Sequence, residues 1–189
     1  HLFLSMTHQK VLQALRQADY LSPKYYVVIA NPPYMGGKGM NARLTSWVKD
    51  NYPDSKSDLF AMFIERNLEL SKSFGSVAMI TMQSWMFLSR HEKLRLKILE
   101  SSPIQDMAHL GTNAFDSIGG EVVSTTAFVL HNSVNPELSG RFIDLKDGAS
   151  EREKQDFLVD SAAGRRVIYS ASAKDFESIS GAPIAYWLS

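Results

Sequence analysis

Hydrophobic and polar residues fall into blocks along this chain, and the blocks predict a mixed α/β fold. Short apolar runs rich in β-branched residues alternate with longer segments of helical periodicity, a pattern typical of a sheet whose strands are joined by helices. Strands are expected at residues 25–30, 77–81, 104–110, 122–131, 141–145 and 165–170, and helices at residues 9–18, 58–73, 91–100 and 150–161. The strands at 104–110 and 122–131 are expected to pair antiparallel, so we predict a mostly parallel sheet with an antiparallel edge strand.

The first helix is expected to be amphipathic. Val11, Leu12 and Leu15 share one face of it, and Ser22-Pro23 closes the segment. This spacing predicts an amphipathic helix.

The second helix, at residues 58–73, has signals at both ends. Residues 55–58 resemble a capping box, and Gly75 is expected to stop the helix. Before it, residues 35–57 are rich in Gly, Asn, Lys, Asp and Ser, which indicates a long irregular connection with one helical turn at residues 44–48. Connections of this length are usually functional or mobile.

Composition narrows the classes of protein. The chain has 189 residues, 44% of them hydrophobic, which suffices for one core. Twenty Lys and Arg balance twenty Asp and Glu, so net charge gives no whole-chain attraction to nucleic acid or membrane. The absence of cysteine excludes disulfides and thiolate metal sites, and the five histidines lack metal-ligand spacing. Because of this, we expect no metal. Since no run of 18 apolar residues occurs, we also expect a cytoplasmic protein with no membrane association.

The sharpest motif is Asn31-Pro32-Pro33-Tyr34, directly after the apolar run at 25–30. Open α/β sheets bind ligands at the carboxyl ends of their parallel strands, where this tetrapeptide is expected. Average proline usage of about 5% makes the tetrapeptide a rare chance event. A plain strand-ending turn remains the alternative interpretation, because Asn and Pro both favour turns.

The motif and its preceding strand resemble the amino-methyltransferases, which transfer a methyl group from S-adenosylmethionine to a planar nitrogen, most often N6 of adenine in DNA. The resemblance implies a partial Rossmann-like fold and names Asn31, Pro32, Pro33 and Tyr34 as catalytic. The Asn31 side-chain oxygen and the Pro32 carbonyl would accept the two amine N–H bonds, favouring the charge that develops on nitrogen. Asn31 would also adjoin the cofactor. Tyr34 would stack on a base rotated out of the duplex.

The resemblance extends to other segments. Leu59 to Arg66 and the closing residues Pro183 to Trp187, together with the tetrapeptide, are similar to the adenine-specific DNA methyltransferases of BREX phage-defence systems. The resemblance implies that Phe63 lines the cofactor's adenine pocket, although a core position is the favoured alternative at this helical spacing. It also implies that Phe115 packs against the flipped adenine. Double-stranded DNA and other phage-defence proteins would be the partners.

Basic residues after the motif could meet DNA phosphates, with a solvated loop as the alternative interpretation. Among them, Lys38 and Arg43 are the candidates for the DNA backbone. The chain begins at His1 and lacks the family's glycine-rich cofactor turn, so residues 1–134 are expected to be the catalytic half of a methyltransferase domain. Residues 135–189 would begin a target-recognition or linker module.

Two rival functions remain open on the sequence. The first is a methyltransferase that acts on a protein glutamine or an RNA base. Its target nitrogen, in an amide or attached to a ring, would need the same two acceptors. A non-catalytic DNA-binding module would keep the tetrapeptide only as a turn.

Overall fold

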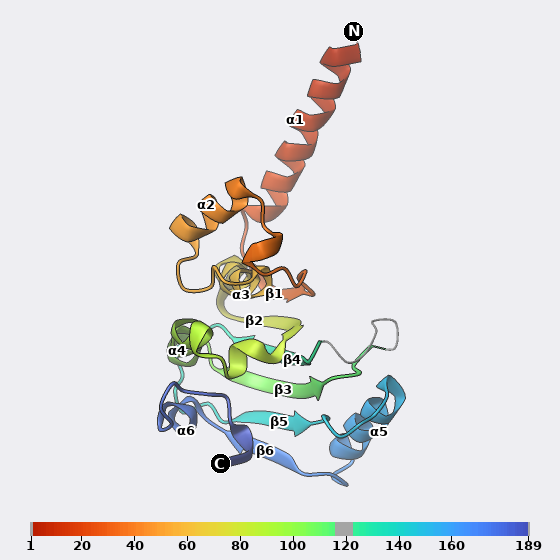
Figure 1. Cartoon of the computed structure of the whole chain (residues 1–189), viewed down its shortest axis with the longest axis vertical. Coiled ribbons are helices and arrows are strands. Elements are labelled where there is room, and N and C mark those ends of the chain that lie inside the picture. The colour runs from red at the N-terminus through yellow and green to blue at the C-terminus, as the bar shows by residue number, and fades with distance from the viewer. Residues whose placement is uncertain (1, 116–122, 189) are drawn as a thin grey trace.

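The computed structural model describes residues 2–115 and 123–188 and forms one α/β unit around a six-stranded sheet (Figure 1). The helices are α1 (Leu2–Leu21), α2 (Ala42–Asn51), α3 (Leu59–Leu70), α4 (Glu92–Ser101), α5 (Glu151–Ala162) and α6 (Ala173–Glu177). The strands are β1 (Tyr25–Ala30), β2 (Ser71–Met82), β3 (Ile104–Gly111), β4 (Thr125–His131), β5 (Gly140–Asp144) and β6 (Ile168–Ala171). Short 3-10 turns are η1 (Gly37–Gly39), η2 (Gln83–Met86), η3 (Ser89–His91) and η4 (Tyr186–Leu188).

The strand order is β1-β2-β4-β3-β5-β6, so the carboxyl ends of β1, β2, β3 and β5 share one edge of the sheet. β1 is parallel to β2, and β3 is parallel to β5. β4 lies between β2 and β3 and is antiparallel to both. The predicted antiparallel pairing of β3 with β4 is confirmed, but β4 is inside the sheet, and the antiparallel edge strand is β6. The expected start of β4 at Val122 lies outside the described residues.

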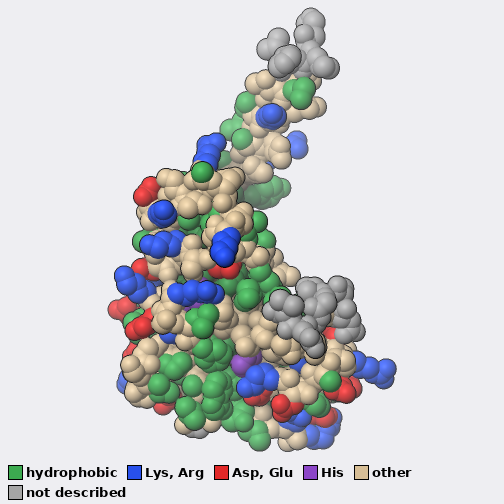
Figure 2. All heavy atoms as spheres, in the orientation of Figure 1, with side chains coloured by type: hydrophobic (Ala, Val, Ile, Leu, Met, Phe, Trp, Pro, Cys, Tyr) green, Lys and Arg blue, Asp and Glu red, His purple; other side chains and the backbone are tan. Residues whose placement is uncertain are grey.

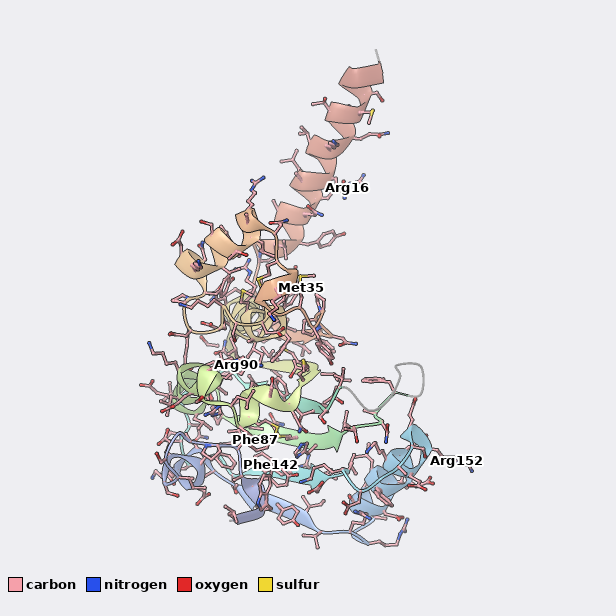
Figure 3. The ribbon with its side chains drawn as sticks, viewed as in Figure 1. Arg16, Met35, Phe87, Arg90, Phe142 and Arg152 are labelled. Carbon is pink, nitrogen blue, oxygen red and sulfur yellow. The ribbon has the colours of Figure 1, made fainter. Side chains whose placement is uncertain are left out.

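One face of the sheet is packed and the other is open. The packed face carries α3 and α4, which contribute Phe60, Ile64, Leu94 and Ile98 to a core shared with alternate residues of the strands. Phe142 of β5 belongs to the same core (Figure 3). On the opposite face, small and branched side chains line an uncovered apolar groove. Within the described chain, α3 and α4 cover the packed side, whereas on the other side Leu158 of α5 borders the groove.

The predicted first helix is confirmed and is longer than expected, and its apolar face is exposed. Val11, Leu12 and Leu15 are 50%, 43% and 61% exposed, and α1 projects away from the sheet (Figure 1). Periodicity correctly identified a helix with an apolar face, but periodicity does not say where the covering partner lies.

The second predicted helix ends earlier than expected, at Leu70 instead of residue 73, and the chain passes directly into β2. Gly75 does not stop the helix but lies within the strand. A Cβ atom there would sit 2.6 Å from Ser71 Oγ and 2.8 Å from the Tyr26 carbonyl oxygen, so the close approach to β1 requires glycine.

The connection after β1 is more ordered than expected. A full helix, α2, replaces the predicted single turn, because the Asn41 side chain caps it by accepting from the Leu44 N–H at 2.9 Å. The predicted boundary near residues 134–139 falls between two strands of one sheet, since β5 and β6 extend it.

Candidate active site

The Asn-Pro-Pro-Tyr loop, residues 31–34, begins where β1 ends, at the edge formed by the carboxyl ends of the parallel strands. Asn31 and Pro33 are exposed, Pro32 is buried and Tyr34 is half-buried. A proline has no N–H to offer a neighbouring strand, so the ladder stops here while the chain stays extended. The buried Pro32 therefore anchors the loop to the domain, and the Asn31 side chain remains exposed to solvent.

The Tyr34 ring packs against an aromatic side chain of α3. Its ring meets Phe60 edge to face, with the two centroids 6.2 Å apart. Phe60 is fully buried, so Tyr34 rests on the core while part of its own ring remains accessible. Burial raises the pKa of the Tyr34 phenol, which is therefore neutral at physiological pH. A neutral aromatic surface of this kind suits stacking on a planar ligand.

Asp58 anchors the far end of the loop, a role that sequence reasoning missed. Its carboxylate accepts from the Met35 N–H at 3.1 Å and from the Phe60 N–H at 3.3 Å, so it caps α3 and holds the loop at once. The Leu59 N–H donates back to the Met35 carbonyl at 2.9 Å. The Met35 side chain, labelled in Figure 3, packs against a small cluster that includes Val48 of α2 and Met62 of α3. The position of Asp58 directly before an apolar helix was a sequence signal for the helix cap, but not for the hydrogen bond to Met35.

Asn31 also borders the open groove of the sheet, which has a volume of about 400 Å³. The groove is lined on the sheet side by apolar residues, among them Ala78, Ile80, Ala127 and Val129. The chain thus offers an exposed amide beside an apolar surface. This combination fits one part of a cofactor site, whereas the described residues before β1 provide no glycine-rich turn to hold the rest of a nucleoside cofactor.

The other predicted site residues are dispersed. Phe63 is half-buried on α3 and packs against the core, and Phe115 is half-buried four residues after β3. Neither ring contacts the Tyr34 ring among the aromatic pairs of the described residues. Lys38 in η1 and Arg43 in the first turn of α2 are exposed. Figure 2 shows several Lys and Arg side chains on the part of the molecule that includes α2. The roles of all four remain predictions.

A family model described as the Eco57I restriction-modification methylase matches residues 5–115, which include the Asn-Pro-Pro-Tyr loop, its Asp58 anchor and the first three strands. The chain belongs to this family. Membership confirms the resemblance to methyltransferases that the loop and its flanking segments suggested.

Two curated relatives are similar over nearly all of this chain. The adenine-specific methyltransferase BrxX of Escherichia coli O9:H4 (strain HS) is 44% identical over 178 residues, covering 94% of this chain and 14% of the relative. The adenine-specific methyltransferase PglX of Lacticaseibacillus casei (strain Zhang) is 44% identical over 187 residues, covering 97% of this chain and 16% of the relative. The chain therefore spans about a seventh of the length of these relatives.

Solved structures share the fold at low identity. The type I restriction-modification methyltransferase subunit of Streptococcus thermophilus matches with a TM-score of 0.57 and 16% identity, over 85% of this chain and 37% of that one. A nuclease-deletion mutant of the Type ISP enzyme LlaGI in complex with a DNA substrate mimic matches with a TM-score of 0.60 and 16% identity, over 83% of this chain and 18% of that one. The predicted Rossmann-like methyltransferase fold is confirmed.

Three polar side chains, those of Gln83, His109 and Tyr186, form a hydrogen-bonded network at the same edge of the sheet. Sequence reasoning missed this network as well. His109, on β3, meets the Tyr186 hydroxyl through Nδ1 at 3.0 Å and the Gln83 side-chain oxygen through Nε2 at 2.5 Å. His109 is 2% exposed and Tyr186 is fully buried. Burial, with a smaller contribution from Lys146, lowers the pKa of His109 to about 4. The imidazole is therefore neutral at physiological pH.

The described residues hold no group of three or more His, Cys, Asp or Glu that could bind a metal ion. None of the helices in the described ranges is both long and apolar enough to cross a membrane.

Proposed function

We propose that this chain is the substrate-facing half of the catalytic domain of a site-specific DNA adenine-N6 methyltransferase. The observation that carries the proposal is the Asn-Pro-Pro-Tyr loop, clamped by Asp58 at the carboxyl edge of the sheet, in a member of the Eco57I methylase family. Relatives named adenine-specific methyltransferases favour adenine as the target base.

The chemistry requires a preorganised pair of acceptors. The lone pair on adenine N6 is delocalised into the ring, so the amine attacks only when its nitrogen is drawn toward tetrahedral geometry. The Asn31 side-chain oxygen and the Pro32 carbonyl would accept the two N–H bonds and stabilise the positive charge that develops there. Tyr34, neutral and supported by Phe60, would stack on the base after it leaves the duplex. S-adenosylmethionine would supply the electrophilic methyl group beside Asn31.

The open face of the sheet supports the proposed division of the protein. β1 is an edge strand of almost wholly apolar sequence, and its Val27 and Ile29 side chains are 59% and 77% exposed. Such a strand is typical of the interior of a parallel sheet. We propose that a further segment of a longer protein, with the glycine-rich cofactor turn, covers this face, and that residues 135–189 lead toward a target-recognition module.

Double-stranded DNA is the proposed partner, with Lys38 and Arg43 meeting its phosphates. From the resemblance to the BREX methyltransferases, we propose a role in cytoplasmic phage defence beside other proteins of such a system. Phe115 would pack against the flipped adenine, and Phe63 would adjoin the cofactor.

Labelled methyl transfer to DNA, RNA and protein by the intact protein tests this proposal. Incorporation into DNA as N6-methyladenine is the expected result. Incorporation only into RNA or a protein glutamine would favour the rival methyltransferase, and no transfer to any substrate would favour a DNA-binding module.

A further inference from the structure

Arg90 is an exposed cation at the carboxyl edge of the sheet that has no role in the chemistry above (Figure 3). It lies in η3, within the connection that runs from the carboxyl end of β2 to the start of α4. β2 is the parallel neighbour of β1, so this connection and the Asn-Pro-Pro-Tyr loop leave the sheet at the same edge. The Arg90 Nε donates to Nε2 of His91 at 3.2 Å, so the guanidinium is attached to a fully buried residue.

Ring contacts connect this arginine with the Asn-Pro-Pro-Tyr loop. The His91 and Phe60 ring centroids are 5.8 Å apart, and Phe60 is the same buried ring against which Tyr34 packs at 6.2 Å. Arg90 is also near Asp58, the anchor of the loop. Burial raises the pKa of the Asp58 carboxyl, and its backbone hydrogen bonds and the charge of Arg90 counteract part of that rise. Two separate observations therefore place Arg90 near the loop.

His91 holds Arg90 at a cost to its own hydrogen bonding. An imidazole that accepts through Nε2 is neutral and carries its proton on Nδ1. Nδ1 is buried and has no hydrogen-bond partner among the described residues, and a buried donor without a partner reduces stability. An apolar residue would fill the same space without this loss, so the packing of the core does not account for the imidazole.

The terminal nitrogens of the Arg90 guanidinium are free to bind an anion. Nε is committed to His91, whereas Nη1 and Nη2 have no hydrogen bond within the described part of the chain. The ion pairs of the described residues do not include Arg90. Two such nitrogens offer parallel N–H bonds, a geometry that matches two oxygens of a phosphate or a carboxylate.

A backbone phosphate is the anion that DNA would bring to this place. Tyr34 would stack on the base that leaves the duplex, and that base remains joined through its sugar to the phosphates on either side. A fixed cation near the ring that supports Tyr34 is therefore placed to meet the backbone of the target nucleotide. Contacts of this kind position a protein on DNA without reading its sequence.

We propose that Arg90 binds a backbone phosphate beside the target adenine, with His91 as the positioning residue that orients its guanidinium. This inference rests on the proposed adenine-N6 activity. It places a phosphate contact next to the base that is methylated, whereas Lys38 and Arg43 lie in the connection before α3.

Single neutral phosphates in DNA test the contact with the intact protein. The probes are duplexes with the sequence that the intact protein methylates, each with one phosphate beside the target adenine replaced by an uncharged methylphosphonate. At one of these positions we expect the unaltered protein to bind at least about tenfold more weakly than it binds the unmodified duplex.

Arg90→Met removes the guanidinium from an exposed position, so the fold should be kept. This variant should bind the unmodified duplex about tenfold more weakly and lose nothing further at the sensitive phosphate. The slope of log Kd against log salt concentration should become shallower by about 0.9, the effect of one phosphate contact. Arg152→Met removes the same charge from an exposed position on α5 and, as the matched control, should keep the full effect of the neutral phosphate.

His91 has its own readout as a positioning residue. His91→Leu keeps the charge of Arg90 but removes the acceptor that orients it, so the salt dependence should be unchanged while the effect of the neutral phosphate shrinks. Arg90→Lys, at an exposed position, keeps the charge without an Nε and should give the same result if the leucine variant does not fold. An unchanged phosphate effect in these variants would overturn the role of His91.

The inference and the proposed function fail in different ways. If Arg90→Met shows the same loss at the neutral phosphate as the unaltered protein, or if no phosphate beside the target adenine is sensitive, the inference is wrong while formation of N6-methyladenine still supports the proposed function. If the unaltered protein makes no N6-methyladenine at all, the proposed function itself fails.

Discussion

At the scale of single residues, the candidate site depends on groups that serve two purposes. Asp58 caps a helix and holds the residue after the tetrapeptide, and His109 is buried in the core while it hydrogen-bonds to Gln83 and Tyr186. The motif itself could be predicted from the sequence because Asn31 to Tyr34 are contiguous. The contacts of Asp58 and His109 could not, since Met35 and Asp58 are 23 positions apart and His109 and Tyr186 are 77 apart.

Asp58 is expected to contribute to stability through its two backbone hydrogen bonds. Asp58→Ala leaves the Met35 and Phe60 N–H groups without their acceptor and should lower the free energy of unfolding by about 1–3 kcal/mol. Asp58→Asn keeps an oxygen acceptor and should cost much less. Urea denaturation of the chain compares the two, and equal losses would show that the hydrogen bonds to Asp58 are not the cause.

The buried histidines should make the fold sensitive to acid. Burial, followed by the positive charges of Arg90 and Arg95, lowers the pKa of His91 to about 4, as burial does for His109. An unfolded histidine has a pKa of about 6.5, so below that pH the unfolded chain binds more protons and stability should decrease toward pH 4.

Urea denaturation across this pH range measures the effect. The double variant His91→Gln, His109→Gln should show a flatter pH dependence than the unaltered chain, and His8→Gln, at an exposed position, should not change it. An unaltered slope in the double variant would contradict the assignment of the acid sensitivity to these two residues.

At the scale of elements, the loop after β2 and the C-terminal segment are joined by one buried cation. Arg95 of α4 is 1% exposed and donates to the Trp85 and Leu88 carbonyls at 2.9 and 2.7 Å. It also donates to the Gly181 and Ala182 carbonyls at 2.6 and 3.1 Å. The strands were predictable because β-branched runs encode them locally. This junction was not, because it joins residues 86 positions apart.

Replacing Arg95 should loosen the C-terminal segment. Arg95→Met keeps the aliphatic volume but leaves four carbonyls without their donor, so unfolding should become easier by roughly 2–4 kcal/mol. Limited proteolysis should then cut after residue 178 sooner than in the unaltered chain. Arg152→Met, on the exposed face of α5 (Figure 3), is the control, and equal proteolysis of both variants would contradict the role of Arg95.

At the scale of the whole molecule, the described residues leave apolar surface exposed on the face of the sheet beside Asn31 and along the stripe on α1. The sequence predicted the apolar patterns of both surfaces but not their exposure, because an apolar pattern does not indicate which segment covers it. Conversely, the neutral net charge does not argue against DNA, since binding would depend on a local surface around Lys38 and Arg43.

The chain alone should bind S-adenosylmethionine weakly. The apolar groove and Asn31 provide one part of a cofactor site, and residues 1–24 contain no glycine-rich turn of the kind expected before the catalytic strand. Isothermal titration calorimetry should therefore detect no micromolar binding to the chain, whereas the intact protein should bind. Micromolar binding by the chain would contradict the proposed division of the site.

The N6-methyladenine content of DNA exposed to the intact protein tests most directly whether Asn31 acts in adenine methylation. Mass spectrometry of the digested DNA should find the modified base with the unaltered protein. With Asn31→Ala it should find at least about 100-fold less, because one acceptor in the transition state is lost. Asn31 is exposed, so the thermal unfolding of this variant should be unchanged. Normal N6-methyladenine with the Asn31→Ala protein would contradict the account.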